Sequence, residues 1–198
     1  LSIEICEDLW MPISPSLYQT VAGATIVANL SASNEIIGKA EYRRDLVRMQ
    51  SAKTVSAYIY ASCGDGESST DVLFSGHCII ADNGKIRCER RDFDASASTN
   101  VSAIVDVSAL VLDRTVTTTF SQELQDLQHV SFRSVYTDFE RALPEEYAQS
   151  LDKYPLLPKS DKDCEEMLNI MAHSLATRMV NTDIRSLVLG LSGGLDSA

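Results

Sequence analysis

The sequence has few of the residues on which several classes of site depend. Its three histidines are scattered, and its five cysteines show no C-x-x-C spacing, so the common zinc and redox patterns have no support. An odd number of cysteines is a poor disulfide framework, and reduced thiols in a cytoplasmic protein fit best. No apolar run approaches the roughly 20 residues of a membrane-spanning helix, and no secretory signal opens the chain.

Positive charge is also scarce. Lys and Arg total 17 against 28 Asp and Glu, a net charge of −11, which argues against non-specific binding to nucleic acid. An acidic protein still binds an anionic nucleotide where backbone amides supply the donors. The 198 residues, 44% of them hydrophobic, suit a globular protein of one or two domains. We therefore expect small-molecule substrates and neither nucleic acid nor membrane as partners.

Periodicity predicts an α/β domain in the first half of the chain. Strands are expected over residues 1–6, 24–30 and 58–62, with helices over 15–22 and 38–56 between them. Ser14 precedes Pro15 as an N-cap does, and the long second helix carries Arg43 and Arg44 on what reads as a solvated face.

A hairpin is predicted next, because Asn83-Gly84 lies between two strand-like runs, 72–80 and 85–89. A strand over 101–111 leading into a short helical segment completes this domain, assigned to residues 1–114.

The remainder of the chain predicts a linker and the beginning of a second domain. Residues 115–159 lose periodicity and contain Pro144, Pro155 and Pro158. Residues 160–198 predict a helix that Ser160 caps, then a buried strand over 186–191 that leads into a glycine-rich loop.

That loop, Ser192-Gly193-Gly194-Leu195-Asp196-Ser197, lacks the Gly-Lys-Ser/Thr of a Walker loop. Its two glycines permit positive φ, so that consecutive amides point at one anion, and its serines add hydroxyl donors. The alternative is an ordinary strand-to-helix turn, in which Ser, Gly and Asp are also common.

Cys6 is the candidate nucleophile, because a thiolate at the end of a strand faces a pocket and can attack a carbonyl. It needs a base and a cation to be activated. From the residue alone, a buried structural cysteine is the more frequent outcome.

Resemblance to known families adds to both motifs. LGLSGGLDS resembles the pyrophosphate-binding loop of N-type ATP pyrophosphatases, and ICEDLW-x-P resembles the nucleophile segment of nitrilase-type glutaminase domains. Their order in one chain resembles the glutamine-dependent NAD⁺ synthetases, since GMP and asparagine synthetases carry other glutaminase types. The stretches NLSASNEIIGKAEYRR, GDGESSTD and PLLPKSDKDCEEMLNI continue this resemblance.

The resemblance implies a fold and a reaction. The fold is the C-terminal half of a nitrilase-type αββα sandwich, followed by the first strand and phosphate loop of a doubly wound α/β ATP pyrophosphatase domain. The reaction converts deamido-NAD⁺ to NAD⁺ with glutamine as the ammonia donor, and it uses ATP with Mg²⁺. A homo-oligomer is also implied.

Roles for individual residues follow from the same resemblance. Cys6 is the nucleophile that forms a glutamyl thioester. The expected glutamine-binding residues are Ser33, Lys39, Glu7 and Trp10, although Lys39 reads equally well as a solvated lysine at a helix start. The expected ATP-binding residues are Gly190, Leu191, Ser192, Gly193, Gly194, Leu195, Asp196 and Ser197. Residues 65–71 border the glutaminase site or form a solvated turn.

Nitrilase-type glutaminases use a Glu–Lys–Cys triad in which Glu and Lys precede the cysteine. We therefore expect this chain to be an internal piece of a longer protein and to be inactive by itself. Two rivals remain at this stage. One is a nitrilase-type carbon–nitrogen hydrolase, an amidase, with a degenerate second domain, and the other is a non-enzymatic interaction module.

Overall fold

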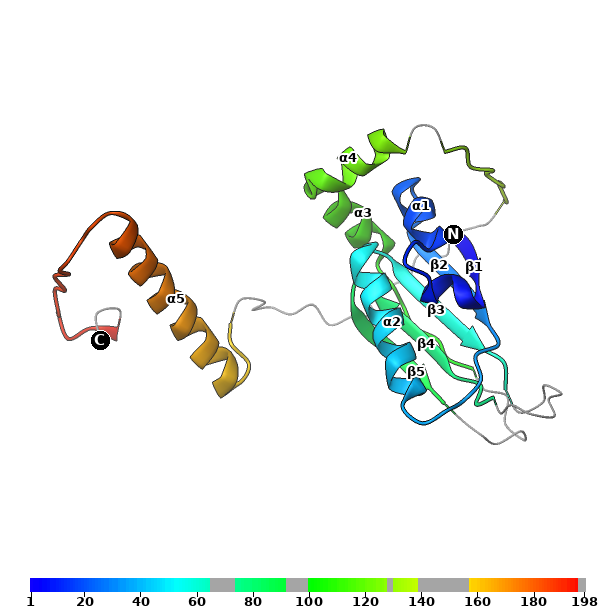
Figure 1. Cartoon of the computed structure of the whole chain (residues 1–198), viewed down its shortest axis with the longest axis horizontal. Coiled ribbons are helices and arrows are strands. Elements are labelled where there is room, and N and C mark those ends of the chain that lie inside the picture. The colour runs from blue at the N-terminus through cyan, green and yellow to red at the C-terminus, as the bar shows by residue number, and fades with distance from the viewer. Residues whose placement is uncertain (65–73, 92–99, 128–129, 139–156, 196–198) are drawn as a thin grey trace. The chain divides into compact units, whose positions relative to one another are not determined.

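The computed structural model describes residues 1–64, 74–91, 100–127, 130–138 and 157–195 (Figure 1). The chain divides into two units, Leu1–Ala148 and Gln149–Ala198. The first unit holds a five-stranded sheet, and the described part of the second holds one long helix.

The sheet has the strand order β1-β2-β3-β4-β5. Its strands are β1 (Ser2–Ile5), β2 (Ile26–Ser31), β3 (Ala57–Ser62), β4 (Cys78–Asp82) and β5 (Lys85–Arg90). The first three are parallel, whereas β3, β4 and β5 pair antiparallel. This mixed α/β sheet confirms the fold class expected from the sequence.

Helices α1 (Pro15–Val21) and α2 (Lys39–Lys53) make the crossovers that parallel strands require. Ser14 is the N-cap residue of α1 and Pro15 its first residue, as predicted. Helix α2 lies along one face of the sheet and packs on β3 and β4 (Figure 1). The hydrophobic core beneath it consists of Leu9, Val27, Val47, Tyr58, Tyr60, Ile79 and Ala81.

The two faces of the sheet differ in burial. On β2, Val27 and Asn29 are buried, whereas Leu30, which points to the opposite face, is 57% exposed. On β1, Glu4 is buried, whereas Ile3 and Ile5 are exposed. An uncovered apolar face is what one half of an αββα sandwich presents, so the structure agrees with that expectation.

The hairpin predicted at Asn83-Gly84 is confirmed. Both residues have positive φ, 44° and 80°, as the tight two-residue turn between β4 and β5 requires. A Cβ added at Gly84 would lie 2.9 Å from the Cβ of Ala52, so the turn packs directly against α2.

Residues 101–111 differ from the prediction. Residues 101–106 form no strand. Asp106 is instead the N-cap of α3 (Val107–Val116), and its carboxylate accepts hydrogen bonds from the amides of Ser108 and Ala109 at 2.9 and 3.0 Å. This N-cap favours helix over strand at this point. Helix α4 (Thr118–Asp126) follows, inside the stretch predicted as a linker.

Arg114 fixes α3 to the ends of α1 and α2. Its buried guanidinium donates to the carbonyls of Thr20, Ala24, Thr54 and Val55, which end α1 and α2. The guanidinium also lies 5.0 Å from the ring centroid of Phe120 on α4.

In the second unit, α5 (Asp161–Asn181) confirms the predicted helix. The amide of Asp163 donates to Ser160 Oγ at 3.2 Å, and the Asp163 carboxylate accepts from the amide of Lys159 at 3.0 Å, a variant of the capping box. The strand predicted over residues 186–191 is wrong. No described strand pairs with this segment, and Val188 is fully exposed, so its apolar run is not buried here.

Candidate functional site

Cys6 lies at the carboxyl end of β1, where the chain turns sharply. Its φ is +48°, a left-handed conformation that few residues other than glycine adopt. A 3₁₀ turn, Cys6–Trp10, begins here, and the Asp8 carboxylate holds it by accepting from the Ile5 amide at 2.7 Å. Backbone strain of this kind is found preferentially at functional sites.

The buried side chain of Asn29 contacts the backbone of Cys6. Asn29 Nδ2 is within hydrogen-bond distance of the Cys6 carbonyl (3.4 Å) and of the Tyr58 hydroxyl (3.2 Å). The Glu4 carboxylate accepts from Tyr58 and from the amide of Ser16. Burial, together with the charge of Glu4, raises the pKa of Tyr58, so its phenol stays protonated.

The thiol of Cys6 lies beside the residues that follow β2. Strands β1 and β2 are parallel, so the residues that follow each of them lie at the same edge of the sheet. The amide of Ala32, just after β2, donates to Cys6 Sγ at 3.5 Å. This contact places Ser33, the next residue, beside the candidate nucleophile.

Ser33 is buried and held on two sides. Its amide donates to Ser62 Oγ at 3.3 Å, at the end of β3, and its own Oγ accepts from Arg43 at 3.1 Å. The hydroxyl proton of Ser33 is therefore oriented away from the guanidinium, because Arg43 carries donors only.

Lys39 and Trp10 lie together. Lys39 Nζ lies 5.4 Å from the ring centroid of Trp10 and donates to Asn34 Oδ1 at 2.5 Å. Trp10 in turn packs against Tyr42, with 5.3 Å between ring centroids. Lys39 is the first residue of α2, where the helix dipole also favours an anion.

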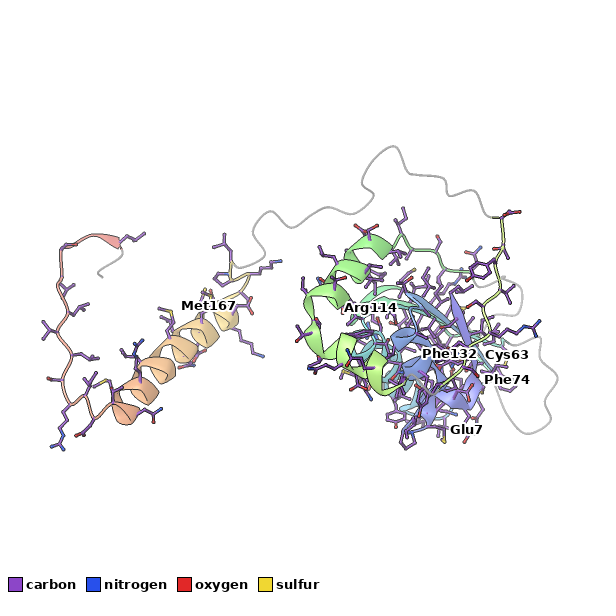
Figure 2. The ribbon with its side chains drawn as sticks, turned by 90° about the horizontal axis from the view of Figure 1, so that it is seen from above. Glu7, Cys63, Phe74, Arg114, Phe132 and Met167 are labelled. Carbon is purple, nitrogen blue, oxygen red and sulfur yellow. The ribbon has the colours of Figure 1, made fainter. Side chains whose placement is uncertain are left out.

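Glu7 is exposed at the outer edge of the first unit (Figure 2). Within the described part of the chain, Glu7 makes no hydrogen bond or ion pair with Cys6, Trp10, Ser33 or Lys39, and Ser33 reaches Cys6 only through its neighbour Ala32. The acidic residues 65–71 lie outside the described residues, so the structure says nothing of their role.

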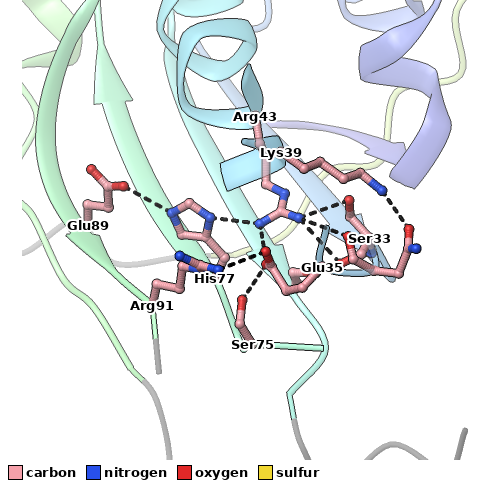
Figure 3. A network of polar contacts seen from close by, with 10 residues as sticks. Ser33, Glu35, Lys39, Arg43, Ser75, His77, Glu89 and Arg91 are labelled. Atoms are coloured by element: carbon pink, nitrogen blue, oxygen red, sulfur yellow. Dashed lines mark hydrogen bonds and ion pairs between the residues drawn. The ribbon is translucent and has the colours of Figure 1, made fainter. Parts of the chain in front are cut away.

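Sequence reasoning missed Arg43, which was placed on a solvated face and is fully buried. Its Nη1 contacts Glu35 Oε1 and His77 Nδ1, each at 2.8 Å (Figure 3). The spacing along the helix could have indicated this burial. Arg43 lies four residues before Val47, which lies four before Ser51, and all three are buried on the face of α2 toward the sheet.

The Glu35 carboxylate and the His77 imidazole, both in contact with Arg43, have displaced pKa values. Burial alone would raise the pKa of Glu35, but hydrogen bonds from Ser75 and Arg43 and the charges of Arg43 and Arg91 outweigh it, so the pKa is lowered. Burial lowers the pKa of His77, and the charge of Arg43 adds to this against the opposing effect of Glu89. Glu35 is thus ionised and His77 neutral.

A cavity of about 620 Å³ lies beside this network. It is lined by Glu35, Ile36, Ile37, Gly38, Ala40, Glu41 and Arg91. It opens next to the loop between β2 and α2 that carries Ser33.

The glycine-rich loop in the second unit is described as far as Leu195. Gly193 has φ +76°, the conformation for which glycine was expected there. The Gly194 amide donates to Ser192 Oγ at 3.4 Å. Gly190 and Leu191 precede it in an exposed stretch, whereas Asp196 and Ser197 lie outside the described residues.

Within the described part of the chain, no group of three or more His, Cys, Asp and Glu residues is arranged to hold a metal ion. No helix there is long and apolar enough to cross a membrane.

Comparison with known proteins gives no matching family model. A curated relative, the glutamine-dependent NAD(+) synthetase of Mycobacterium tuberculosis, is 37% identical over 206 residues. The match covers 100% of this chain and 30% of the relative, so the chain spans about a third of the length of such proteins.

Two solved structures are also similar. A glutamine-dependent NAD(+) synthetase from Cytophaga hutchinsonii is 34% identical, with a TM-score of 0.38 over 45% of this chain and 14% of that one. A carbon–nitrogen hydrolase from Helicobacter pylori is 15% identical, with a TM-score of 0.46 over 61% of this chain and 44% of that one.

Proposed function

The chain is homologous along its whole length to glutamine-dependent NAD(+) synthetases, and on that premise we propose that the full-length protein carrying it makes NAD⁺ from deamido-NAD⁺. Glutamine supplies the nitrogen and ATP supplies the driving force. Residues 1–114 belong to a glutaminase domain, 115–159 form a linker, and 160–198 begin the synthetase domain. The enzyme acts in the cytoplasm as a homo-oligomer.

In the glutaminase reaction, Cys6 Sγ attacks the side-chain amide carbon of glutamine. A carbon–sulfur bond forms, the carbon–nitrogen bond breaks, and ammonia leaves with a proton from the acid–base partner of the thiol. Water then hydrolyses the thioester to glutamate and returns the proton to the thiol. The Glu and Lys of the triad, which the family places before the cysteine, assist these transfers.

Four side chains bind the glutamine in this proposal. The Lys39 ammonium pairs with the α-carboxylate, and the Ser33 hydroxyl donates to the same substrate. Trp10 forms an apolar wall that also holds Lys39 in place. Glu7 receives the α-ammonium group, and its exposure makes this the weakest of the four contacts.

In the synthetase reaction, the carboxylate of deamido-NAD⁺ attacks the α-phosphorus of ATP, and pyrophosphate leaves into the loop Gly190–Ser197. Ammonia then attacks the adenylated carboxyl carbon and displaces AMP. Amides around Gly193 supply donors for the pyrophosphate. Mg²⁺, when bound, neutralises the phosphate charges, but the described residues offer no metal cluster and no step here depends on it.

One observation carries the glutaminase assignment. Cys6 occupies a left-handed turn at the end of β1, and the Ala32 amide that contacts its sulfur leads directly to the Ser33–Lys39 segment. A purely structural cysteine has no need of this strained turn.

The test uses the full-length protein and a Cys6→Ala variant. NAD⁺ formation from deamido-NAD⁺ and ATP is measured with glutamine and, separately, with ammonium chloride. We expect the variant to lose the glutamine-dependent reaction and to keep the ammonia-dependent one. Replacing the exposed Cys164 with Ala is the matched control and leaves both rates unchanged.

The rivals give different results. An amidase with a degenerate second domain releases ammonia without consuming ATP in a deamido-NAD⁺-dependent way. An interaction module keeps glutamine-dependent synthesis in the Cys6→Ala variant, because the activity then resides elsewhere.

A further inference from the structure

We infer that Arg43 is a positioning residue for glutamine recognition, which rests on the proposed glutaminase function and extends it to a residue outside the substrate contacts. The guanidinium holds the loop between β2 and α2 in the conformation that presents Ser33 to the substrate. Glu35 and His77 hold the guanidinium, and Glu89 holds His77.

The two Nη atoms of Arg43 donate to different groups: Nη1 to the Glu35 and His77 side chains, and Nη2 to the loop that carries Ser33. Nη1 donates to Glu35 Oε1 and to His77 Nδ1, both at 2.8 Å. Nη2 donates to Ser33 Oγ at 3.1 Å and lies 3.4 Å from the carbonyl oxygens of Ser33 and Asn34 (Figure 3). All four Nη protons are thus engaged, and the loop receives those on one nitrogen.

Burial makes this arrangement specific. The Arg43 side chain is 0% exposed and that of Glu35 5% exposed, so the pair is shielded from solvent and stabilised by its own hydrogen bonds. A buried charge without its partners is costly, so the guanidinium cannot leave the loop for water as a surface arginine can. Movement of Ser33 away from Arg43 therefore carries a free-energy penalty.

His77 completes the support on the other side. Since Arg43 donates to Nδ1, the imidazole proton is on Nε2 and is donated to Glu89 Oε1 at 3.0 Å. Glu89 also pairs with Arg44 at 2.8 Å, which ties β5 to α2. The Arg43 head is therefore fixed against strands β4 and β5 while its other nitrogen fixes the loop.

The consequence for Ser33 is directional. Because its oxygen accepts from a cation, its own O–H is a stronger donor and points away from Arg43. A substrate carboxylate or carbonyl beside Lys39 is the kind of acceptor this hydroxyl suits. Arg43 acts through Ser33 and does not itself touch glutamine in this assignment.

The experiment compares Arg43→Lys, Ser33→Ala and the double variant in the full-length protein. Lysine keeps the charge, but its compact ammonium cannot donate on both sides as the fork does. We expect each single variant to raise the KM for glutamine roughly tenfold to hundredfold, the range for loss of a charge-assisted hydrogen bond. The ammonia-dependent rate stays within about twofold, and the effects of the two substitutions are not additive.

Arg48→Lys is the matched control, since this arginine lies on the same helix and is 48% exposed. A structural role for Arg43 would lower the ammonia-dependent rate and the thermal midpoint together, and its effect would add to that of Ser33→Ala. Either result overturns the assignment. If Arg43→Lys does not fold, His77→Leu, which removes an acceptor that holds Nη1 of Arg43, replaces it in the cycle.

A second readout separates this inference from the proposed function. A diazoketone analogue of glutamine alkylates a glutaminase thiol by forming a carbon–sulfur bond with loss of N₂, and labelling of Cys6 needs no ATP or deamido-NAD⁺. Saturable labelling that Arg43→Lys leaves unchanged overturns the role of Arg43 alone. Absence of labelling in the unsubstituted protein overturns the glutaminase assignment and this inference with it.

Discussion

Arg43 donates a hydrogen bond to Nδ1 of His77 at 2.8 Å inside a buried site. A second proton on the imidazole would set a donor against a donor and one positive charge against another. The ring is therefore kept neutral by its neighbour as well as by burial, and both effects lower the pKa of His77.

This predicts a pH dependence of stability. The unfolded imidazole takes up a proton below about pH 6.5, whereas the folded one resists it, so the unfolded state binds more protons and the free energy of unfolding falls as pH decreases. The slope is at most about 1.4 kcal/mol per pH unit for one proton. Chemical denaturation between pH 7.5 and 5.5 measures it, a window above the range in which Glu35 titrates.

The same measurement on His77→Asn should give a smaller slope, because asparagine retains an acceptor for Arg43 and does not titrate. Equal slopes in the two proteins would contradict the prediction.

The left-handed backbone of Cys6 leads us to expect that a glycine variant is more stable than an alanine variant at this position. Glycine adopts φ +48° without strain, whereas alanine carries the same penalty as cysteine. Cys6→Gly should therefore have a free energy of unfolding about 1 kcal/mol above that of Cys6→Ala, although neither variant has the thiol. A lower stability for the glycine variant would show that the turn relaxes once the thiol is removed.

Lys39 predicts a change in substrate binding. Lys39→Met keeps the aliphatic stem against Trp10 and removes the charge, so the KM for glutamine should rise roughly tenfold or more. Steady-state kinetics with glutamine and with ammonia distinguish this from a general loss of activity, since the ammonia-dependent rate should not change. Lys53→Met, at the other end of α2, is the control.

Arg114 predicts a large loss of stability. Alanine at this position leaves the carbonyls of Thr20, Ala24, Thr54 and Val55 without their donor in a mostly buried setting. The free energy of unfolding should fall by about 2–4 kcal/mol. Arg48→Ala removes only an exposed ion pair and should change it by less than about 0.5 kcal/mol.

Gly84 predicts two separable penalties. Alanine there adds strain at φ +80° and a contact with the Ala52 side chain, so Gly84→Ala should cost about 1–3 kcal/mol in unfolding free energy. Adding Ala52→Gly removes the contact and leaves the strain. If the double variant is more stable than the sum of the two single losses predicts, the close approach of residue 84 to Ala52 is confirmed. If the two losses in unfolding free energy simply add, the close approach is contradicted.

The sequence predicted well where a local pattern decides the structure. Asn83-Gly84 determines its turn, and Pro15 begins its helix. The apolar run at 24–30 does contain the strand β2, but the burial on both faces that such an unbroken run indicates is wrong, because Leu30 is exposed. The positive φ that the glycine-rich loop was expected to adopt is present at Gly193. Cys6, Trp10 and Lys39 were named from a family resemblance, and the structure places Trp10 and Lys39 in contact.

Prediction failed where tertiary contacts decide. Arg43 looks like a surface residue until Glu35 and His77, which are distant in sequence, surround it. Residues 186–191 have the composition of a buried strand, yet a strand exists only where another strand pairs with it, and no described strand does so. Helix α4 arose in a stretch read as a linker, because its prolines lie only further along the chain.

The uncovered face of the sheet has a consequence for handling this polypeptide. Ile3, Ile5 and Leu30 are exposed side by side on β1 and β2, and β1 is the edge strand of the described sheet. Exposed apolar side chains next to an open edge are the usual starting point for self-association. Produced as this chain alone, the polypeptide should form soluble oligomers or inclusion bodies at concentrations where a protein with that face covered remains dispersed.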